Sequence, residues 1–389
     1  MTTVFDAGTA GPRTHALVIG VGQYPYCTDA SLTEATGIEG ALARQFDSVT
    51  SPPASARTFA EWLMTHQAGD PAVPLGSVEL LMSPPADGKA VVNGQDGVVT
   101  VAPPTLAAVR EAFDRWFARC DTSEDNVAMF YFSGHGCEQN EQFALLEDIG
   151  RDPLRFFANA INVNMLVEGM TRCAAHTQCY FIDACRTVPH EVLELSRIAS
   201  DALIQPYTHR PVRNVALIPS AARGCDARGV KGGTTLFTDV LLEALSGGAA
   251  VRHNSQWGVD VSKIAVTVNQ LLEWHGERRQ PPPDPRVCQP RIIRQLGNEP
   301  LVPFRFGCEP REALASAALC LVDHQRSDRM LVREPVAALW EDSTAPSFMS
   351  SLRADFSDHE YDATCEQMQI MPPCVEEDLH VSGGRRGHG

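Results

Sequence analysis

Short runs of consecutive apolar residues alternate along the chain with segments whose apolar residues recur every three or four positions. The runs predict buried strands, and the recurrence predicts amphipathic helices. The predicted strands are His15–Val21, Val78–Leu81, Val127–Phe132, Gln178–Ile182, Val215–Ile218 and Leu301–Phe306. The predicted helices are Ser55–His66, Thr105–Cys120, Asn164–Cys173, Thr234–Leu245 and Ser262–Trp274. Strands that alternate with helices favour an α/β fold with a mostly parallel central sheet.

The pattern changes after Phe306. Arg311–Val322 predicts one more helix, whereas Thr344–Gly389 is polar and acidic and shows no periodic apolar stripe. We therefore predict an α/β domain over residues 1–307 and an acidic extension over 308–389. That extension is either an interaction module or partly disordered.

Composition narrows the class of protein. The 389 residues are 44% hydrophobic and 21% charged, as in ordinary globular proteins. The net charge of −16 argues against a nucleic-acid partner. No apolar run approaches the length of a membrane span, and the N-terminal residues lack the pattern of a secretory signal. The 12 cysteines follow no repeated spacing, which predicts reduced thiols and a cytoplasmic location.

Two of the predicted strands end in side chains suited to thiol chemistry. Val127–Gly136 closes with a histidine between two glycines, and Thr177–Arg186 closes with Asp-Ala-Cys-Arg. Functional groups gather beyond the carboxyl ends of parallel strands, so we expect His135 and Cys185 to lie together. A thiol is nucleophilic as the thiolate, and a nearby imidazole supplies the base and later the acid. The flanking glycines leave the N–H of Gly136, together with that of Cys185, available to stabilise an oxyanion.

Two further sets of residues have weaker interpretations. Ser220 and Asp226 follow another predicted strand and are candidates for lining a substrate groove. Cys173, His176 and Cys179 have a spacing that invites a zinc interpretation. Structural zinc requires four ligands, and this segment joins a predicted helix to a buried strand, so we predict no metal site.

The two motifs together resemble those of caspase-like cysteine peptidases. Ser133–Gly136 is similar to the family's His motif and Asp183–Arg186 to its Cys motif, and the resemblance covers roughly residues 14–306. A histidine about 50 residues before the cysteine is characteristic of caspases. The resemblance implies that Cys185 is the nucleophile and His135 the general acid and base.

The resemblance also bears on specificity. Metacaspases and paracaspases carry Asp two residues before the nucleophile, in the primary pocket, where true caspases carry Gln. Asp183 therefore implies cleavage after Arg or Lys, and Gly136 would be the family's oxyanion donor. Two positions depart from the metacaspase pattern: Ser55 stands where an acidic residue is usual, and Arg186 is more typical of caspases.

The sequence and the resemblance together predict a regulated bacterial endopeptidase acting in defence or cell death. Its substrate would be a protein, such as a pore-forming or other effector, and an activator or sensor could bind residues 308–389. We predict no cofactor. Some metacaspases depend on Ca²⁺, which Glu138, Glu141, Glu147 and Asp148 could bind, although a solvated acidic loop is the other interpretation. A catalytically silent homologue that acts as a scaffold or adaptor is the alternative function.

Overall fold

The computed structural model describes residues 1–389 except 9, 29–37, 86–87, 186–197, 207–212, 221–232, 276–288, 327–328, 358–359 and 384–389. The chain divides into two compact units. The first consists of Met1–Leu242 and Asp260–Gln295, and the second of Glu243–Val259 and Leu296–Gly389. The boundary predicted between residues 307 and 308 falls inside a strand of the second unit.

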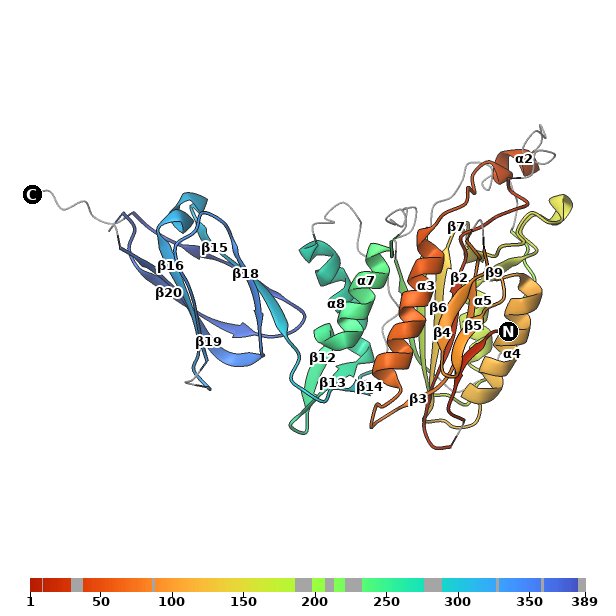
Figure 1. Cartoon of the computed structure of the whole chain (residues 1–389), viewed down its shortest axis with the longest axis horizontal. Coiled ribbons are helices and arrows are strands. Elements are labelled where there is room, and N and C mark those ends of the chain that lie inside the picture. Colours follow the sequence, from red (N-terminus) through yellow and green to blue (C-terminus); the bar gives the residue numbers. More distant parts are fainter. Residues whose placement is uncertain are drawn as a thin grey trace, which may run out of the picture. The chain divides into compact units, whose positions relative to one another are not determined.

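A six-stranded sheet forms the centre of the first unit (Figure 1). In order across the sheet its strands are β1 (Thr3–Asp6), β3 (Leu75–Met82), β2 (Thr14–Gly20), β6 (Val127–Gly134), β10 (Thr177–Ala184) and β11 (Asn214–Pro219). All neighbours pair in parallel except β1, which runs antiparallel to β3. The predicted α/β class with a mostly parallel sheet is confirmed. β1 was missed because only Val4 is buried in this short edge strand.

Helices cover both faces of this sheet. The helices of the first unit are α2 (Ile38–Ala43), α3 (Ser51–Trp62), α4 (Leu106–Cys120), α5 (Val163–Met170), α7 (Leu236–Glu243) and α8 (Val261–Trp274). Phe59 of α3 stacks on Tyr131 of β6 at 4.5 Å between ring centroids, whereas Trp116 of α4 lies 6.3 Å from Phe130. Adjacent strand residues point to opposite faces, so α3 and α4 lie on opposite sides of the sheet (Figure 1).

Side-chain caps fix where several helices begin. Thr105 accepts a hydrogen bond from the N–H of Ala108 and starts α4, as predicted. Asn162 accepts from the N–H of Met165, so α5 begins at Val163. β4 (Val91–Gly94) and β5 (Gly97–Thr100) pair in a separate two-stranded hairpin.

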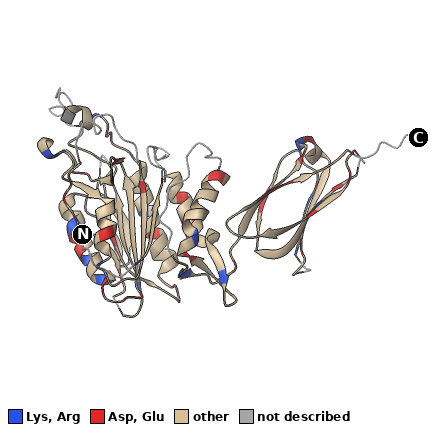
Figure 2. Ribbon diagram, turned by 180° about the vertical axis from the view of Figure 1, so that it is seen from behind, with Lys and Arg blue, Asp and Glu red and all other residues tan. Residues whose placement is uncertain are grey.

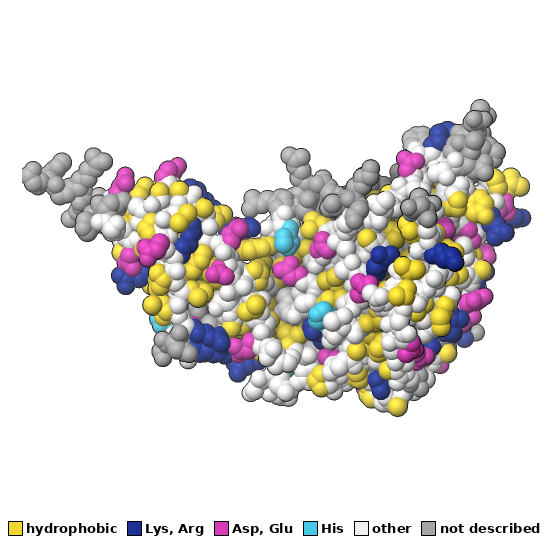
Figure 3. All heavy atoms as spheres, in the orientation of Figure 1, with side chains coloured by type: hydrophobic (Ala, Val, Ile, Leu, Met, Phe, Trp, Pro, Cys, Tyr) yellow, Lys and Arg dark blue, Asp and Glu magenta, His cyan; other side chains and the backbone are white. Residues whose placement is uncertain are grey.

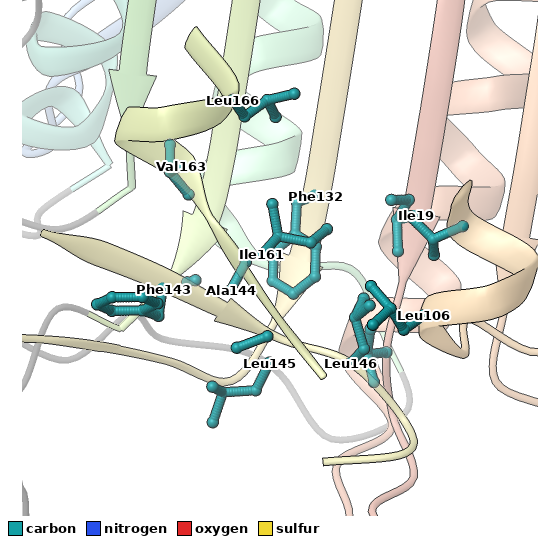
Figure 4. Packing of buried hydrophobic residues seen from close by; sticks show 14 of the residues in the cluster. Ile19, Leu106, Phe132, Phe143, Ala144, Leu145, Leu146, Ile161, Val163 and Leu166 are labelled. Atoms are coloured by element: carbon teal, nitrogen blue, oxygen red, sulfur yellow. The ribbon is translucent and has the colours of Figure 1, made fainter. Parts of the chain in front are cut away.

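A small three-stranded sheet packs beside the end of β6. It consists of β7 (Gly136–Glu138), β8 (Gln142–Leu145) and β9 (Ala160–Asn162). Phe143 and Leu145 from β8 and Ile161 from β9 belong to the same buried cluster as Phe132 (Figure 4). Ser133 and Gly134, which follow Phe132, lead from the central sheet into the small sheet. Because both sheets are packed in one core, the turn between them is held in place.

The second unit is built mostly of antiparallel strands. A hairpin joins β12 (Ala250–His253) to β13 (Gln256–Asp260), and one sheet has the order β18 (Trp340–Thr344), β15 (Val302–Glu309), β21 (Val375–His380). The other sheet has the order β17 (Met330–Arg333), β16 (Ala317–Asp323), β19 (Ser347–Phe356), β20 (Thr364–Ile370). Phe304 and Phe306 stack at 4.5 Å, and Trp340 lies edge-on to Phe304 at 5.2 Å. This unit thus has a hydrophobic core of its own.

Two predictions for this region were wrong in detail. Leu301–Phe306 does form a strand, β15, but in the second unit and not in the central sheet. Arg311–Val322 is a short 3₁₀ turn followed by β16, whose alternate residues are buried, because pairing with β17 and β19 overrides the helix preference of its alanines. Thr344–Gly389, for which an interaction module and partial disorder were both open, contributes strands although it lacks a periodic apolar stripe.

Charged side chains of both signs are spread over the described surface. Acidic and basic side chains are interspersed on the face seen in Figure 3, and both signs occur along α4 beside the N-terminus in Figure 2. There Arg115 and Arg119 of α4 bind the buried carboxylate of Glu79, at 3.2 Å and 2.6 Å.

No helix among the described residues is long and apolar enough to cross a membrane.

Candidate active site

β6 and β10 end at the same point of the sheet edge. Their residues pair in parallel register from Val127 opposite Thr177 to Gly134 opposite Ala184. His135 and Cys185 come directly after the last residues of these two strands. Parallel neighbours lie about 4.8 Å apart, so the register brings the two predicted residues to adjacent positions beyond the carboxyl ends.

His135 is held by contacts to its ring and to its backbone. Its Nε2 lies 2.7 Å from the carbonyl oxygen of Asp47, and its N–H donates to the hydroxyl of Tyr24 at 2.7 Å. The Tyr24 ring packs against the imidazole at 4.9 Å between centroids, and that of Phe46 at 5.7 Å. Burial lowers the pKa of His135, partly offset by the Asp47 carbonyl. The ring therefore favours its neutral form.

The Asp47 contact also selects a tautomer. A carbonyl oxygen can only accept, so Nε2 carries the proton and donates it to Asp47. In the neutral ring Nδ1 is then the unprotonated nitrogen, which can accept a proton from a thiol.

Cys185 differs in exposure from the other described cysteines of the first unit. Cys185 is partly exposed, whereas Cys27, Cys120, Cys137, Cys173 and Cys179 are buried. Burial raises the pKa values of Cys27 and Cys137 to about 12, so these thiols stay protonated. Accessibility to a substrate therefore favours Cys185 as the reactive thiol among them.

The glycines of the His motif are needed for close packing. A Cβ on Gly136 would lie 2.7 Å from the carbonyl oxygen of Cys185 and 2.9 Å from the Cβ of Ala184. A Cβ on Gly134 would lie 3.1 Å from the Tyr24 hydroxyl. The turn around His135 and the residues at the end of β10 can approach this closely only without these side chains.

The N–H of Gly136 points away from β8. The N–H of Leu145 donates to the carbonyl of His135 at 3.0 Å, which makes these two residues a hydrogen-bonded pair. Bonded and non-bonded pairs alternate in an antiparallel ladder, so the next pair, Gly136 with Ala144, is non-bonded. The pairing therefore does not use the Gly136 N–H, in keeping with the predicted role as an oxyanion donor, which remains a prediction.

Asp183 is buried one strand position below the sheet edge. Its Oδ2 accepts hydrogen bonds from the hydroxyls of Ser133 (3.1 Å), Thr238 (3.3 Å) and Thr235. Its Oδ1 has no hydrogen-bond partner among the residues that the structure describes. Burial raises the pKa of Asp183 to about 6, against the opposing effect of the hydroxyl donors.

The remaining candidates have different outcomes. Ser220 follows β11, is buried, and donates to the carbonyl of Ala184 at 3.4 Å, so it lies beside the end of β10. Ser55 is also buried and accepts the N–H of Thr235 at 2.9 Å, which joins it to the group around Asp183. Asp226 lies outside the described residues, as does Arg186.

Three of the four acidic residues considered for Ca²⁺ accept hydrogen bonds from different partners. Glu147 accepts from the Ser83 hydroxyl at 2.6 Å, Asp148 from the N–H of Leu106 at 3.0 Å, and Glu141 from the Asn162 amide at 2.7 Å. Within the described part of the chain, no group of three or more His, Cys, Asp or Glu side chains is arranged to hold a metal ion. The absence of a cofactor stays a prediction.

Sequence reasoning missed three residues at this site: Tyr24, Asp47 and Thr235. Tyr24 stands in a Tyr-Pro-Tyr stretch in the segment that follows β2, and Thr235 is the second of two threonines that precede α7. Hydroxyl residues directly after a strand or before a helix are a usable signal. Asp47 acts through its backbone, for which the sequence carries no signal.

Together these observations define an α/β protein with a histidine and an accessible cysteine at the carboxyl edge of a parallel sheet. The family model described as a caspase domain matches residues 13–286, which is most of the chain. The chain therefore belongs to the caspase-domain family. This membership supports cysteine peptidase activity.

Comparison with individual proteins gives more distant similarities. The uncharacterized protein y4kE of Sinorhizobium fredii is 27% identical over 234 residues, covering 55% of this chain and 66% of that protein. A protein named "probable protease" from a Desulfuromonadales bacterium is 28% identical over 180 residues, covering 45% of this chain and 18% of that protein. The chain thus spans less than two thirds of either relative. Caspase-1 of Spodoptera frugiperda is 11% identical, with a TM-score of 0.40 and coverage of 76% of this chain and 91% of that one.

Proposed function

We propose that this protein is a cysteine endopeptidase that uses Cys185 and His135 and cleaves after Arg or Lys. The observation that carries the proposal is the register of β6 and β10, which puts the His and the accessible Cys at adjacent strand ends. Family membership supports the same class of reaction.

The reaction would proceed through a thioester. Nδ1 of His135 takes the Cys185 proton, and the thiolate attacks the carbonyl carbon of the scissile peptide bond. The N–H groups of Gly136 and Cys185 stabilise the resulting oxyanion, an interaction worth roughly 3–4 kcal/mol per donor in acyl transfer. The imidazolium then gives its proton to the leaving amine. Water, deprotonated by His135, finally hydrolyses the thioester and restores the thiol.

The preference for a basic residue rests on Asp183. Its Oδ1 is buried without a partner among the described residues, and the carboxyl group makes no ion pair with any described side chain. A negative group in this position attracts the cationic side chain of Arg or Lys and repels the anionic side chain of Asp or Glu. Ser220, at the end of the neighbouring strand, and Asp226 are proposed as further substrate-binding residues.

We further propose that the protein acts in the cytoplasm on a protein substrate, in bacterial defence or regulated cell death. A pore-forming or other effector would be the substrate, and residues 308–389 would bind an activator. The family resemblance and the bacterial origin of the two sequence relatives support this setting.

The test is cleavage of fluorogenic peptides that differ only in the residue before the scissile bond: Arg, Lys, Ala or Asp. We expect cleavage of the Arg and Lys peptides, and loss of more than a thousandfold with Cys185→Ala or His135→Ala. Cys320→Ala is the matched control, because Cys320 is also partly exposed but lies in the second unit. Cleavage only after Asp would contradict the role of Asp183. No cleavage with any peptide, with or without Ca²⁺, would favour the scaffold alternative.

A further inference from the structure

Three hydroxyl groups converge on one oxygen of Asp183, and the other oxygen accepts no hydrogen bond from the part of the chain that the structure describes. Ser133 donates from the end of β6, and Thr235 and Thr238 donate from the start of α7, all to Oδ2. We propose that Thr235 is a specificity-determining residue that acts by positioning Asp183. Its hydroxyl keeps the carboxyl group charged and oriented so that Oδ1 faces the basic side chain of the substrate. This inference rests on the proposed function.

The contacts of Thr235 determine where its proton points. Its own N–H donates to the Ser55 hydroxyl at 2.9 Å, which ties the residue to α3. Its Oγ1 accepts the N–H of Thr238 at 3.2 Å and thereby caps α7. Because that oxygen is already an acceptor on the helix side, its proton is available to donate to Oδ2 of Asp183. One side chain therefore caps the helix and stabilises the carboxylate.

The surroundings of Asp183 contain hydroxyl groups in place of a second charge. Ser55, Ser133, Thr235 and Thr238 are buried, and the Tyr131 hydroxyl lies 2.6 Å from that of Thr238. Tyr131 is a titratable side chain close to this carboxyl group, and burial raises its pKa, so it remains neutral. The charge of Asp183 is thus stabilised by neutral donors, which support an anion without neutralising it.

This arrangement gives Ser55 a role at the position where metacaspases are usually acidic. A hydroxyl at this point accepts the N–H of Thr235 and contributes no charge, so Asp183 is the single carboxylate of the described group. The capacity of the pocket to bind a cation then depends on the ionisation of one residue. The effect of the hydroxyl donors on Asp183 can therefore be measured in the pH dependence of cleavage.

The experiment compares Thr235→Val with Thr235→Ser in the full-length protein. Cleavage of the Arg peptide is measured from pH 5 to pH 9. Removing a donor to the charged form raises the pKa of Asp183, so Thr235→Val should move the acidic limb of kcat/KM upward by about one pH unit. At pH 6.5 we expect KM to rise more than kcat falls. Thr235→Ser keeps the hydroxyl and should retain the wild-type profile.

A second variant separates the effect on Asp183 from the effect of losing the helix cap. Ser133→Ala removes the 3.1 Å hydrogen bond to Oδ2 and leaves the cap of α7 intact, so it should shift the limb in the same direction. Circular dichroism checks that each variant is folded. If the wild type cleaves after Arg and both folded variants reproduce its pH profile, the inference is overturned. If the wild type does not cleave after Arg at all, the proposed function itself fails.

Discussion

The histidine at this site is positioned by groups that the motif does not include. The Asp47 carbonyl bonds the imidazole on one side, and the Tyr24 hydroxyl accepts the backbone N–H of the same residue. Tyr24 is fully buried, and its ring packs on the imidazole. His135 is thus held at its ring and at its backbone by residues from the segment between β2 and α3.

Replacing Tyr24 by Phe should therefore affect turnover more than it affects binding. The substitution keeps the ring and leaves the partly buried N–H of His135 without its acceptor, which should destabilise the fold by about 1–3 kcal/mol. We expect kcat to fall roughly tenfold, because His135 is less well oriented, with little change in KM. The measurements are urea unfolding and steady-state cleavage of the Arg peptide.

Tyr180→Phe provides the matched control. Tyr180 is equally buried, and its hydroxyl donates to Gln178 at 2.8 Å, away from His135. It should lose comparable stability and keep its kcat. Equal losses of kcat in the two variants would argue against a specific role for Tyr24.

The buried charge of Asp183 should lower the free energy of unfolding at neutral pH, while it provides the preference for a basic residue. Its pKa is raised from 3.8 to about 6, so the folded protein binds the proton more tightly than the unfolded chain. The stability that this proton contributes is present below about pH 4 and is lost as the pH rises to about 6. Asp183→Asn removes the buried charge and should raise the free energy of unfolding at pH 8, by up to about 3 kcal/mol, while abolishing the preference for Arg. Urea unfolding at pH 5 and pH 8 measures the effect.

Asp70→Asn serves as the comparison for that variant. Asp70 is also buried, but both of its oxygens accept backbone N–H groups, from Ala72, Val73 and Gln295. An amide there would place a donor against a donor, so this variant should lose stability. A loss of stability at pH 8 in Asp183→Asn as well would show that the buried carboxylate is stabilising.

At the scale of elements, the turn between β6 and β7 depends on glycine. Gly136→Ala would bring a methyl group to 2.7 Å from the backbone oxygen of Cys185, and backbone cannot move aside as a side chain can. We expect a loss of about 1–3 kcal/mol in stability and at least a tenfold loss of cleavage. Gly69→Ala, where a Cβ would meet nothing within 4 Å, should leave both unchanged. Full activity in Gly136→Ala would contradict this close packing.

The central strands and the motif turns could be predicted from the sequence because each is encoded locally. An apolar run such as that of β10 is buried on both faces and can hardly be anything other than a central strand. The location of the two motifs could then be predicted, because each stands at the carboxyl end of such a strand. The grouping of Ser55, Ser133 and Thr235 around Asp183 could not be predicted, because these residues come from separate elements and meet only through tertiary packing.

Elements of the second unit were harder to predict for a related reason. β16 has alternating burial, yet its sequence contains two alanines and two leucines that also suit a helix. Its conformation is decided by pairing with β17 and with β19, which come later in the chain. Local preference is weak where the stabilising contacts are long-range.

At the scale of the whole molecule, the second unit has its own core, and the position of its first long strand decides where the chain can be shortened. β15 carries Phe304 and Phe306, which pack with Trp340 in that core. Ending the chain after residue 307 would keep both phenylalanines and remove the strands that bury them. Exposed apolar surface of this kind promotes aggregation.

We therefore expect a chain of residues 1–295 to behave better than a chain of residues 1–307. The shorter chain keeps the six-stranded sheet, α8 and every described residue of the proposed site, so it should remain monodisperse and cleave the Arg peptide. The longer chain should aggregate during size-exclusion chromatography. A double substitution, Phe304→Ser with Phe306→Ser, should restore the solubility of the longer chain if these two side chains are the cause. If residues 1–295 fold but no longer cleave, the second unit contributes to activity, as an activator-binding module would; if they do not fold, the division into two units does not describe independent folding.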